Sequence, residues 1–311
     1  MNGTQPSSCY WNPTAAKIGL TFACCLIFLV SLAGNTLIGI IVYKTKTMRK
    51  PINFLIVNMA MSNLLFPIFL IPWDIQGLYI NSWLIGGPLG QALCKLVGFL
   101  PGVSIFVSIQ SLVLIAVDRF GAVVFPLRSP LIRSKLCSFF ILATWIIAMA
   151  LHSPYLFALK LVEYPEELVC GLRWKEVFGE SYYYYEVSIS MIYYLIPLVL
   201  IATLYITIYI KLKSRKIPGE QSANAEQQRQ QSEPNVLKMA TDIVLGFAVC
   251  LLPCCIVWFL VFFVSDIWSL CGFQYFDFFA FFVARINCAM NPCICFIFSK
   301  NYRIGLKNLF R

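Results

Sequence analysis

Seven long runs of apolar residues dominate the chain, and shorter polar segments separate them. A helix that crosses the hydrocarbon core of a bilayer needs about 20 mostly apolar residues. The runs of this length are residues 18–43, 52–72, 94–118, 137–159, 184–210, 239–264 and 273–298. Membrane-spanning strands would instead alternate apolar and polar positions over segments of about 10 residues. The pattern therefore predicts an all-α membrane protein, a bundle of seven transmembrane helices.

The segments between the runs are too short to form further domains. We therefore expect residues 1–311 to form a single seven-helix membrane domain, with residues 1–17 ahead of the first span. The segment 214–235 is rich in Gln and Ser, a composition that favours a flexible loop. After the last span, residues 300–311 are predicted to form a short amphipathic eighth helix.

The distribution of charged residues predicts how the bundle is oriented in the membrane. The chain is 59% hydrophobic and 12% charged, with a net charge of +10. Most of its basic residues fall on one side of the predicted bundle, and Lys and Arg concentrate on the cytosolic side of membrane proteins. We therefore expect an extracellular N-terminus, in which Asn2 begins a candidate glycosylation site, Asn2-Gly3-Thr4. This orientation accounts for the positive charge, so we expect a lipid bilayer around the chain and no nucleic-acid partner.

The cysteines can be sorted by the side of the membrane on which they are expected to lie. Thirteen Cys are scattered along a chain with a single His, which does not suggest a zinc site. The four on the expected extracellular, oxidising side are Cys9, Cys94, Cys170 and Cys271. A bridge from Cys94 to Cys170 would fasten the longest outer loop to the third span, and Cys9 with Cys271 is a second candidate pair. The alternative for each pair is free thiols.

Polar residues and prolines recur inside the spans. In hydrocarbon a charged side chain costs roughly 3 kcal/mol unless it faces the protein interior, and a proline removes a backbone hydrogen bond. We expect these residues to find partners across the bundle. The most prominent are Asn35, Asn58, Asn63, Ser108, Asp118, Arg119, Trp145, Pro197, Tyr205, Pro253, Asn287, Asn291 and Pro292.

In order and spacing, these residues resemble the motifs of the rhodopsin-like (class A) G-protein-coupled receptors, over nearly the whole chain. The matching segments are Gly34-Asn35, Asn58 to Asn63, Trp83, Cys94 with Cys170, AVDRF at 116–120, CLLP at 250–253 and NPCIC at 291–295. The stretch VLKMATDIVLGF at 236–247 is similar to the neuropeptide-receptor branch. The resemblance implies a multi-pass receptor of the plasma membrane that needs no cofactor and is not an enzyme.

The resemblance also implies how such a receptor signals. An extracellular ligand would activate a heterotrimeric G protein through an outward movement of the sixth helix about Pro253. Arg119 is expected to pair at rest with Asp118, and also with Glu233, before it contacts the G protein. The residues implied for G-protein coupling are Asp118, Arg119, Phe120, Tyr205 and Glu233. Those implied for the activation core are Asn35, Asn63, Ser108, Ile109, Pro197, Phe247, Leu251, Pro253, Asn287, Asn291, Pro292 and Cys295.

Three departures from the family pattern change these expectations. Asn63 stands where the family usually has an aspartate that holds a sodium ion. A neutral amide offers an acceptor but no charge to offset a buried cation, so we expect weak or absent sodium coupling and no bound metal. Leu251 replaces the usual tryptophan below the ligand pocket, and Cys295 replaces a tyrosine that helps to hold the active state. Both replacements are therefore expected to affect the stability of the resting state relative to the active state.

The residues narrow the choice of ligand. A retinal-binding opsin needs a lysine in the seventh span, and this span carries Arg285 instead, whose guanidinium stays protonated. Amine receptors use an aspartate in the third span, where this chain has Leu100-Pro101-Gly102. Acidic and aromatic residues on the expected outer side favour a short cationic and aromatic peptide; the alternative is an interfacial aromatic belt with solvated acids. The pocket residues that we expect are Asp74, Pro101, Ile105, Glu186 and Arg285.

Arg285 leaves two hypotheses open. It could receive the carboxylate of a lipid or another small anionic ligand, or it could pair within the protein with Asp74 of the second span, which we favour. A membrane transporter is the competing class, because an arginine among acids can line a solute path, but no internal repeat supports it. An enzyme is less consistent still, since no nucleophile and base occur together and His152 stands alone in the fourth span as a packed residue.

Overall fold

The expected seven-helix bundle is present. The computed structural model describes residues 13–80, 82–125, 131–165, 167–214, 223–264, 267 and 270–309, with the backbone alone over 223–240. Seven helices in this part of the chain are long and apolar enough to cross a membrane. Six of the spans lie in α1 (Pro13–Lys44), α2 (Pro51–Tyr79), α3 (Gly87–Val124), α4 (Ser134–His152), α9 (Ala223–Phe263) and α10 (Cys271–Phe298).

The fifth span is built from three consecutive elements. α7 (Tyr182–Ser190) leads into a π-helical turn, η3 (Met191–Leu195), and α8 (Ile196–Ser214) continues to the end of the span. The turn ends at Leu195, two residues before Pro197. A proline donates no backbone hydrogen bond and its ring crowds the preceding helical turn. The wider turn accommodates this interruption without ending the helix.

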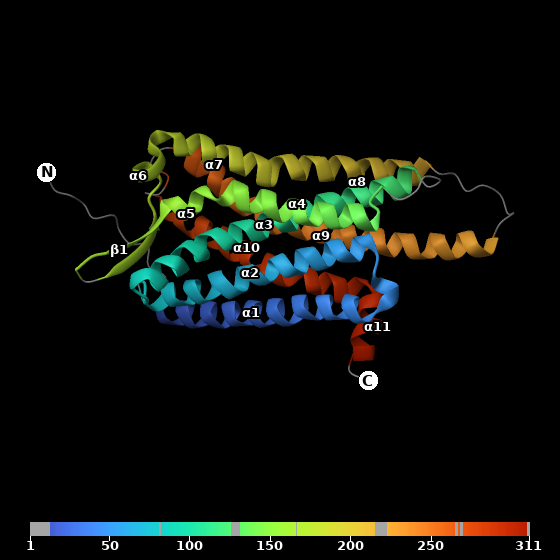
Figure 1. Cartoon of the computed structure of the whole chain (residues 1–311), viewed down its shortest axis with the longest axis horizontal. Helices are drawn as coiled ribbons and strands as arrows, with labels where there is room; N and C mark the ends of the chain where they lie inside the picture. Colours follow the sequence, from blue (N-terminus) through green and yellow to red (C-terminus); the bar gives the residue numbers. More distant parts are fainter. Residues whose placement is uncertain are drawn as a thin grey trace.

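The helices lie side by side, with α3 at the centre (Figure 1). α3 packs against α2, α4 and α8, while α1 packs against α2 and α10, and α10 packs against α9. The close approach of α1 to α10 needs a glycine, because a Cβ on Gly34 would lie 2.6 Å from Cβ of Pro292. The largest buried cluster, which contains Ile109, Leu112 and Phe247, joins α1, α2, α3 and α4 with α8, α9 and α10.

One end of the bundle carries a β hairpin, and we call it the hairpin end (Figure 1). β1 (Leu159–Glu163) pairs antiparallel with β2 (Leu168–Leu172), and Leu161 lies opposite Cys170. The expected disulfide is confirmed: Cys170 is bonded to Cys94 of α3, with 5.7 Å between the two Cα atoms. The hairpin was not expected, because its two short strands lie outside any long apolar run and depend on this covalent link to α3.

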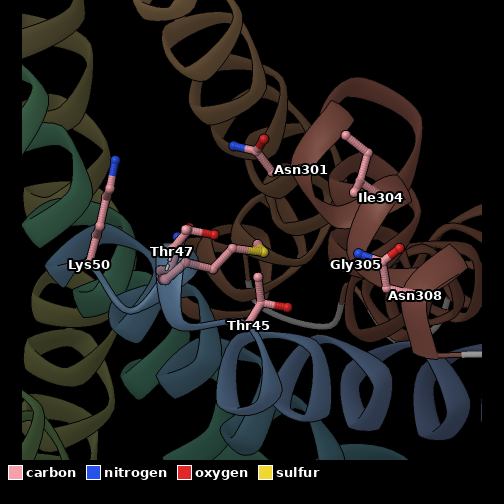
Figure 2. A pocket seen from close by; sticks show the side chains of 9 residues that line it. Thr45, Thr47, Lys50, Asn301, Ile304, Gly305 and Asn308 are labelled. Atoms are coloured by element: carbon pink, nitrogen blue, oxygen red, sulfur yellow. Dashed lines mark hydrogen bonds between the residues drawn. The ribbon is translucent and has the colours of Figure 1, made fainter.

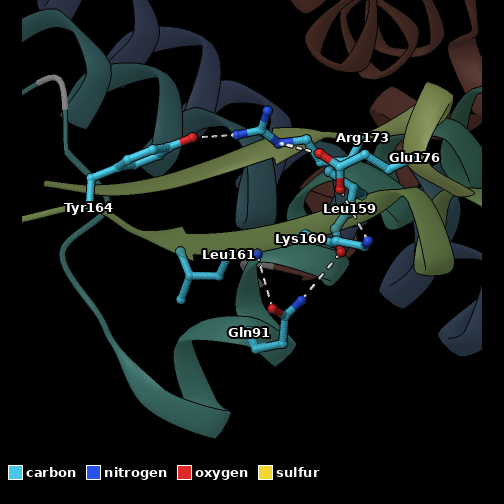
Figure 3. A network of polar contacts seen from close by, with 7 residues as sticks. All are labelled: Gln91, Leu159, Lys160, Leu161, Tyr164, Arg173 and Glu176. Carbon is cyan, nitrogen blue, oxygen red and sulfur yellow. Dashed lines mark hydrogen bonds and ion pairs between the residues drawn. The ribbon is translucent and has the colours of Figure 1, made fainter.

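Polar contacts dock the hairpin on the start of α3 (Figure 3). The Gln91 side chain donates to the carbonyl of Leu159 at 3.3 Å and accepts from the backbone N–H of Leu161 at 3.0 Å. Beyond the hairpin, Arg173 donates to the Tyr164 hydroxyl at 2.8 Å. Short helices follow, α6 (Trp174–Phe178) and the 3-10 turn η2 (Gly179–Ser181). These contacts place the hairpin over the end of the bundle.

Two boundaries differ from the expected ones. The fourth span was expected to run unbroken over 137–159, but α4 ends at His152 and the short α5 (Pro154–Ala158) follows, because Pro154 interrupts the hydrogen-bond ladder. The segment 214–235 was expected to be a loop, yet α9 begins at Ala223 within it. Ala, Gln and Glu are common in this stretch and favour helix. Flexibility was inferred from polarity, and polarity alone does not exclude helix.

The opposite end of the bundle, which we call the α11 end, holds two small elements. The 3-10 turn η1 (Lys46–Met48) joins α1 to α2, and the expected eighth helix is α11 (Lys300–Leu309). α11 turns sideways from the end of α10 (Figure 1). It packs back on α1, where Gly305 meets Ile41. Its strongly one-sided distribution of apolar residues suits the surface of a bilayer.

Candidate functional site

An ion pair joins α2 to α10 in the half of the bundle nearer the hairpin end. Arg285 donates through Nε and Nη2 to the two carboxylate oxygens of Asp74, with 2.7 Å from Nη2 to Oδ1. The side chains of Arg285 and Asp74 are only 18% and 15% exposed. The predicted pairing is confirmed. Bidentate contacts between Arg and a carboxylate are among the stronger hydrogen bonds in proteins, so both charges inside the span are satisfied.

Asp277 supplies a second carboxylate near Arg285. It lies two turns before Arg285 on α10, toward the hairpin end, and the two charges attract each other. Oδ1 of Asp277 is buried and has no hydrogen-bond partner within the described ranges. Unlike Asp74, this carboxylate therefore has a buried oxygen that is not satisfied by a hydrogen bond among the described residues.

Glu186 lies in a separate cluster formed by α4, α5, α6 and α7. Tyr155 donates its hydroxyl to Oε1 of Glu186 at 3.0 Å. The Tyr155 ring stacks on His152, with 4.5 Å between the ring centroids, and meets Trp174 edge-on at 4.9 Å. Tyr185 also lies against Trp174, at 5.3 Å. Glu186 is thus a half-buried carboxylate beside an aromatic cluster, with no basic partner in the described part of the chain.

His152 is packed, as predicted from its isolation in the sequence. Its side chain is 6% exposed and shares a hydrogen bond with the Tyr193 hydroxyl, with 2.5 Å between Nδ1 and the phenolic oxygen. Gly102 of α3 makes room for the ring, since a Cβ there would overlap Nε2. Sequence reasoning missed Tyr155 and Tyr193. Both lie among many other aromatics, and only the fold shows that they link His152 to Glu186 and to η3.

The other two expected pocket residues lie inside the bundle. Pro101 is buried in α3, and Ile105, one turn further along, is half-buried between two core clusters. One of these clusters contains Phe66 and Cys288 of the helices that carry Asp74 and Arg285. The structure therefore brings Ile105 toward the ion pair, whereas Glu186 belongs to another group of helices.

Amide side chains connect the spans below the ion pair. Asn35 donates to the backbone carbonyl of Cys288 at 2.9 Å and so links α1 to α10. Asn58 donates to the Ser111 hydroxyl at 3.0 Å and accepts from Nε1 of Trp145 at 2.8 Å. One asparagine therefore ties α2 to both α3 and α4. In hydrocarbon, where no water is available, these contacts satisfy both amide atoms of Asn58 and the Nδ2 group of Asn35, whereas Oδ1 of Asn35 is buried without a partner in the described region.

Asn63 lies at the centre of a second, less satisfied group. Ser108 donates its hydroxyl to Oδ1 of Asn63 at 2.9 Å. Nδ2 of Asn63, Oδ1 of Asn287 and both amide atoms of Asn291 are buried without a hydrogen-bond partner in the described region. All of these donors and acceptors are neutral, and a cation in a low-dielectric cavity needs a compensating charge. The residues at this position do not fit the sodium ion that the family resemblance suggests.

Apolar residues separate this group from the α11 end. Ile109, Phe247, Leu251 and Cys295 are all buried in the largest core cluster. Pro197 is buried in α8, and α9 continues through Pro253 without ending. These residues of the implied activation core therefore connect α3, α9 and α10, although their role in activation stays a prediction.

Arg119 lies near the α11 end of α3. It donates from Nη2 to Oδ2 of Asp118 at 2.5 Å and from Nε at 3.2 Å, which confirms the expected pair. Tyr205 of α8 interacts electrostatically with Arg119, and its hydroxyl has no hydrogen-bond partner among the described residues. The Phe120 ring lies edge-on to Phe125, with 6.1 Å between centroids.

Several expected site residues lie outside the described residues. These are Asn2, Cys9 and the side chains of Glu233 and Cys271. The glycosylation site, the second disulfide and the contact of Arg119 with Glu233 therefore stay predictions.

Comparison with known proteins matches this architecture. The family model described as "7 transmembrane receptor (rhodopsin family)" matches residues 34–294. The RYamide receptor of Drosophila melanogaster is 30% identical over 96% of this chain, and the QRFP-like peptide receptor of Branchiostoma floridae is 32% identical over 78%. The chain spans 64% of the length of each of these two relatives. Neuropeptide FF receptor 1 of Homo sapiens is 32% identical over 96% of this chain and 71% of its own length.

A charge swap tests the ion pair between α2 and α10. Asp74→Ala or Arg285→Ala leaves one half-buried charge without its partner, which should cost roughly 3 kcal/mol of stability. Asp74→Arg combined with Arg285→Asp restores the attraction, so we expect it to recover surface expression and thermal stability lost in the single variants. Both are measured in cells and in detergent. If the double variant is expressed at the surface no more strongly, and is no more thermally stable, than the single variants, the pairing is contradicted.

A second substitution tests the neutral group around Asn63. Asn63→Asp adds the missing carboxylate beside Ser108, so sodium should bind the folded variant and raise its melting temperature by mass action. We expect no such rise in the unchanged protein when sodium replaces potassium at constant ionic strength. Asn63→Ala is the control, since it changes the site without adding charge. A sodium response in the unchanged protein, or none in Asn63→Asp, would contradict the interpretation.

Proposed function

The chain belongs to the rhodopsin family of seven-transmembrane receptors, in its neuropeptide-receptor branch, and we propose that it binds a short cationic and aromatic peptide and activates a heterotrimeric G protein. It is a multi-pass protein of the plasma membrane and a receptor, not an enzyme. The hairpin end faces the outside and the N-terminus is extracellular, an orientation supported by the concentration of Lys and Arg at the other end.

Two incompletely paired carboxylates carry the ligand proposal. Glu186 and Asp277 are both half-buried, and neither forms an ion pair within the described part of the chain. A carboxylate out of water is costly unless a cation or hydrogen bonds satisfy it. A ligand with Arg or Lys side chains supplies that cation, and the rings around Glu186 offer additional attraction for it.

The other acids contribute less to ligand binding. Asp74 is occupied by Arg285, and Glu176 forms ion pairs with Lys160 and Arg173 at 3.3 and 3.9 Å. Glu163 and Glu167 also lack an ion pair among the described residues, but both are exposed to solvent, whereas Glu186 and Asp277 are half-buried. The relatives are named as receptors for RYamide, a QRFP-like peptide and neuropeptide FF, which supports a peptide ligand.

The alternative ligand, a lipid or a small anion, is disfavoured by the same contacts. Its carboxylate would have to displace Asp74 from a bidentate contact with Arg285. The displaced Asp74 would then be left without a cation in a half-buried position. Transport is disfavoured as well, because the chain belongs to a family of receptors.

The proposed signal passes from the ligand end to Arg119. Peptide binding favours a second arrangement of α9 and α10, in which α9 moves outward about Pro253. The apolar cluster of Phe247 and Leu251 couples this movement to α3. Arg119 leaves Asp118 and contacts the G protein, while the Tyr205 hydroxyl, which has no partner in the described residues, is placed to accept its new hydrogen bonds.

A peptide screen tests the ligand proposal. Short peptides that differ in charge and aromatic content are applied to expressing membranes, and guanine-nucleotide exchange is measured. We expect cationic, aromatic peptides to stimulate exchange, and Glu186→Gln to lower their potency about tenfold through loss of a charge-assisted contact. Glu163→Gln, an exposed acid on β1, is the matched control and should not change it. Activation by anionic lipids with equal potency in Glu186→Gln would overturn the proposal.

The role of Arg119 is tested separately from ligand binding. Arg119→Ala should reduce stimulated nucleotide exchange to the basal rate, because the cation that contacts the G protein is gone. Binding of the active peptide should persist, since Arg119 lies at the far end of the bundle. Lys135→Ala removes an exposed cation at the same end and should leave exchange intact. Exchange that survives in Arg119→Ala would contradict this role.

A further inference from the structure

A polar cavity lies at the α11 end, between the turn that joins α1 to α2 and the eighth helix (Figure 2). Its volume is about 300 Å³. At roughly 30 Å³ per water molecule, it is far larger than a single ion and falls at the lower end of the range for small-ligand sites. The lining residues are Thr45, Thr47, Met48, Lys50, Asn53, Asn301, Ile304, Gly305 and Asn308.

The lining offers many hydrogen-bond donors and no negative charge. Hydroxyl and ammonium groups come from the turn and the start of α2, and amide groups come from both walls of the cavity. No Asp or Glu occurs in residues 44–73 or in residues 278–311, so neither wall contains an acid. Lys46 and Lys50 are exposed, and their ammonium groups have no partner in the described chain. The cavity therefore suits a ligand that accepts hydrogen bonds and carries negative charge.

The two arginines beside the cavity behave differently from these lysines. Arg49 donates to the carbonyl of Tyr43 at 2.6 Å and lies over its ring, and Arg303 donates to the carbonyl of Ile297. Both are held against the backbone of the bundle. The lysines are left as free cations for a ligand.

The walls of the cavity are held firmly by packing. Tyr302 is 1% exposed and donates its hydroxyl to Oδ1 of Asn53 at 3.5 Å, and burial raises the pKa of this phenol, so it stays protonated. A Cβ on Gly305 would lie 2.4 Å from Cγ2 of Ile41, so the glycine allows α11 to approach α1 closely. Asn53 also donates to the carbonyl of Met48 at 2.7 Å, which holds the turn against α2. The cavity is therefore part of the fold.

Apolar residues border the cavity on the side of the bilayer. Ile304 lines it and is 45% exposed, and Ile297 at the end of α10 is 60% exposed. In a membrane such side chains contact acyl chains, while the polar lining lies at the depth of the headgroups. The site therefore places a charged polar pocket directly beside a lipid-facing surface.

We propose that this cavity binds the phosphorylated headgroup of an anionic phospholipid. Basic pockets at the cytoplasmic ends of membrane-spanning helices attract such headgroups. Here Lys50 in the lining and the neighbouring Lys46, outside the lining, supply charge. Thr47 and the Asn side chains donate hydrogen bonds, and Ile304 meets the acyl chains. The bound lipid fastens α11 to the start of α2. The assignment to the cytosolic leaflet rests on the orientation proposed above, while the binding itself does not depend on the peptide ligand.

Lipid binding is measured on the purified full chain in detergent. Native mass spectrometry counts bound molecules of phosphatidylinositol bisphosphate and phosphatidylcholine, and soluble inositol trisphosphate is titrated in parallel. We expect one tightly bound phosphatidylinositol bisphosphate and no comparable binding of phosphatidylcholine. Lys50→Gln should weaken this binding about fivefold. Because Lys50 makes no side-chain cap to α2, the variant is expected to fold. Asn308→Leu, on the opposite wall, should weaken binding as well.

Lys211→Gln provides the matched control, since Lys211 is an exposed cation near the end of α8, outside the cavity. It should leave lipid binding unchanged. Equal weakening by Lys50→Gln and Lys211→Gln would mean diffuse charge attraction and would overturn the proposal. Soluble inositol trisphosphate that binds as tightly as the lipid would also overturn it, because a free phosphate compound would then be the ligand. Loss of peptide-stimulated exchange alone bears on the proposed receptor function and not on this site.

Discussion

Hydrocarbon offers no partner to a polar group, and this constraint governs how the seven helices are arranged. A charge or amide inside a span is either paired with a group on another helix or left unpaired, and an unpaired group lowers the stability of the bundle. The pair of Asp74 with Arg285 joins α2 to α10, and Asn58 joins α2 to α3 and α4. The polar residues thus determine which faces of the helices meet, while the apolar clusters fill the space between them. Dispersion alone would tolerate many rotations of an apolar helix.

The same constraint explains how much could be predicted from the sequence. A long apolar run has few alternatives to a spanning helix, so the seven spans followed directly. An arginine within such a run needs an acid, and Asp74 was close enough in depth to be named as its partner. The disulfide between Cys94 and Cys170 followed from the expected outer side of the membrane together with the family resemblance. In each case the chemistry of the residues allowed only a few possible structures or partners.

The contacts and elements that were not predicted depend on helix rotation and packing, which the order of apolar and polar residues in the sequence does not reveal. The contact of Glu186 with Tyr155 depends on the rotation of α7 and on the break at Pro154, and neither follows from apolar periodicity. The hairpin is short, half-buried and held by Cys170, so no long run signals it. The cavity beside α11 has residues from segments some 250 positions apart in the sequence. These segments meet because α11 packs against α1, and Gly305 lets the two helices approach closely.

The neutral group around Asn63 changes how the two halves of the bundle can be coupled. A carboxylate at this position would attract a cation and resist movement of the surrounding helices, since separating charges in a low dielectric is costly. Asparagine both donates and accepts, so Asn63, Asn287 and Asn291 can exchange hydrogen bonds without moving a charge. Their unpartnered atoms show that the arrangement in this structure leaves some of this capacity unused among the described residues. The two ion pairs inside the spans lie on either side of this group, Arg285 with Asp74 and Arg119 with Asp118. In the mechanism we propose, a ligand at one end and a G protein at the other act on these ion pairs, and the layer between them transmits the change through packing and neutral hydrogen bonds.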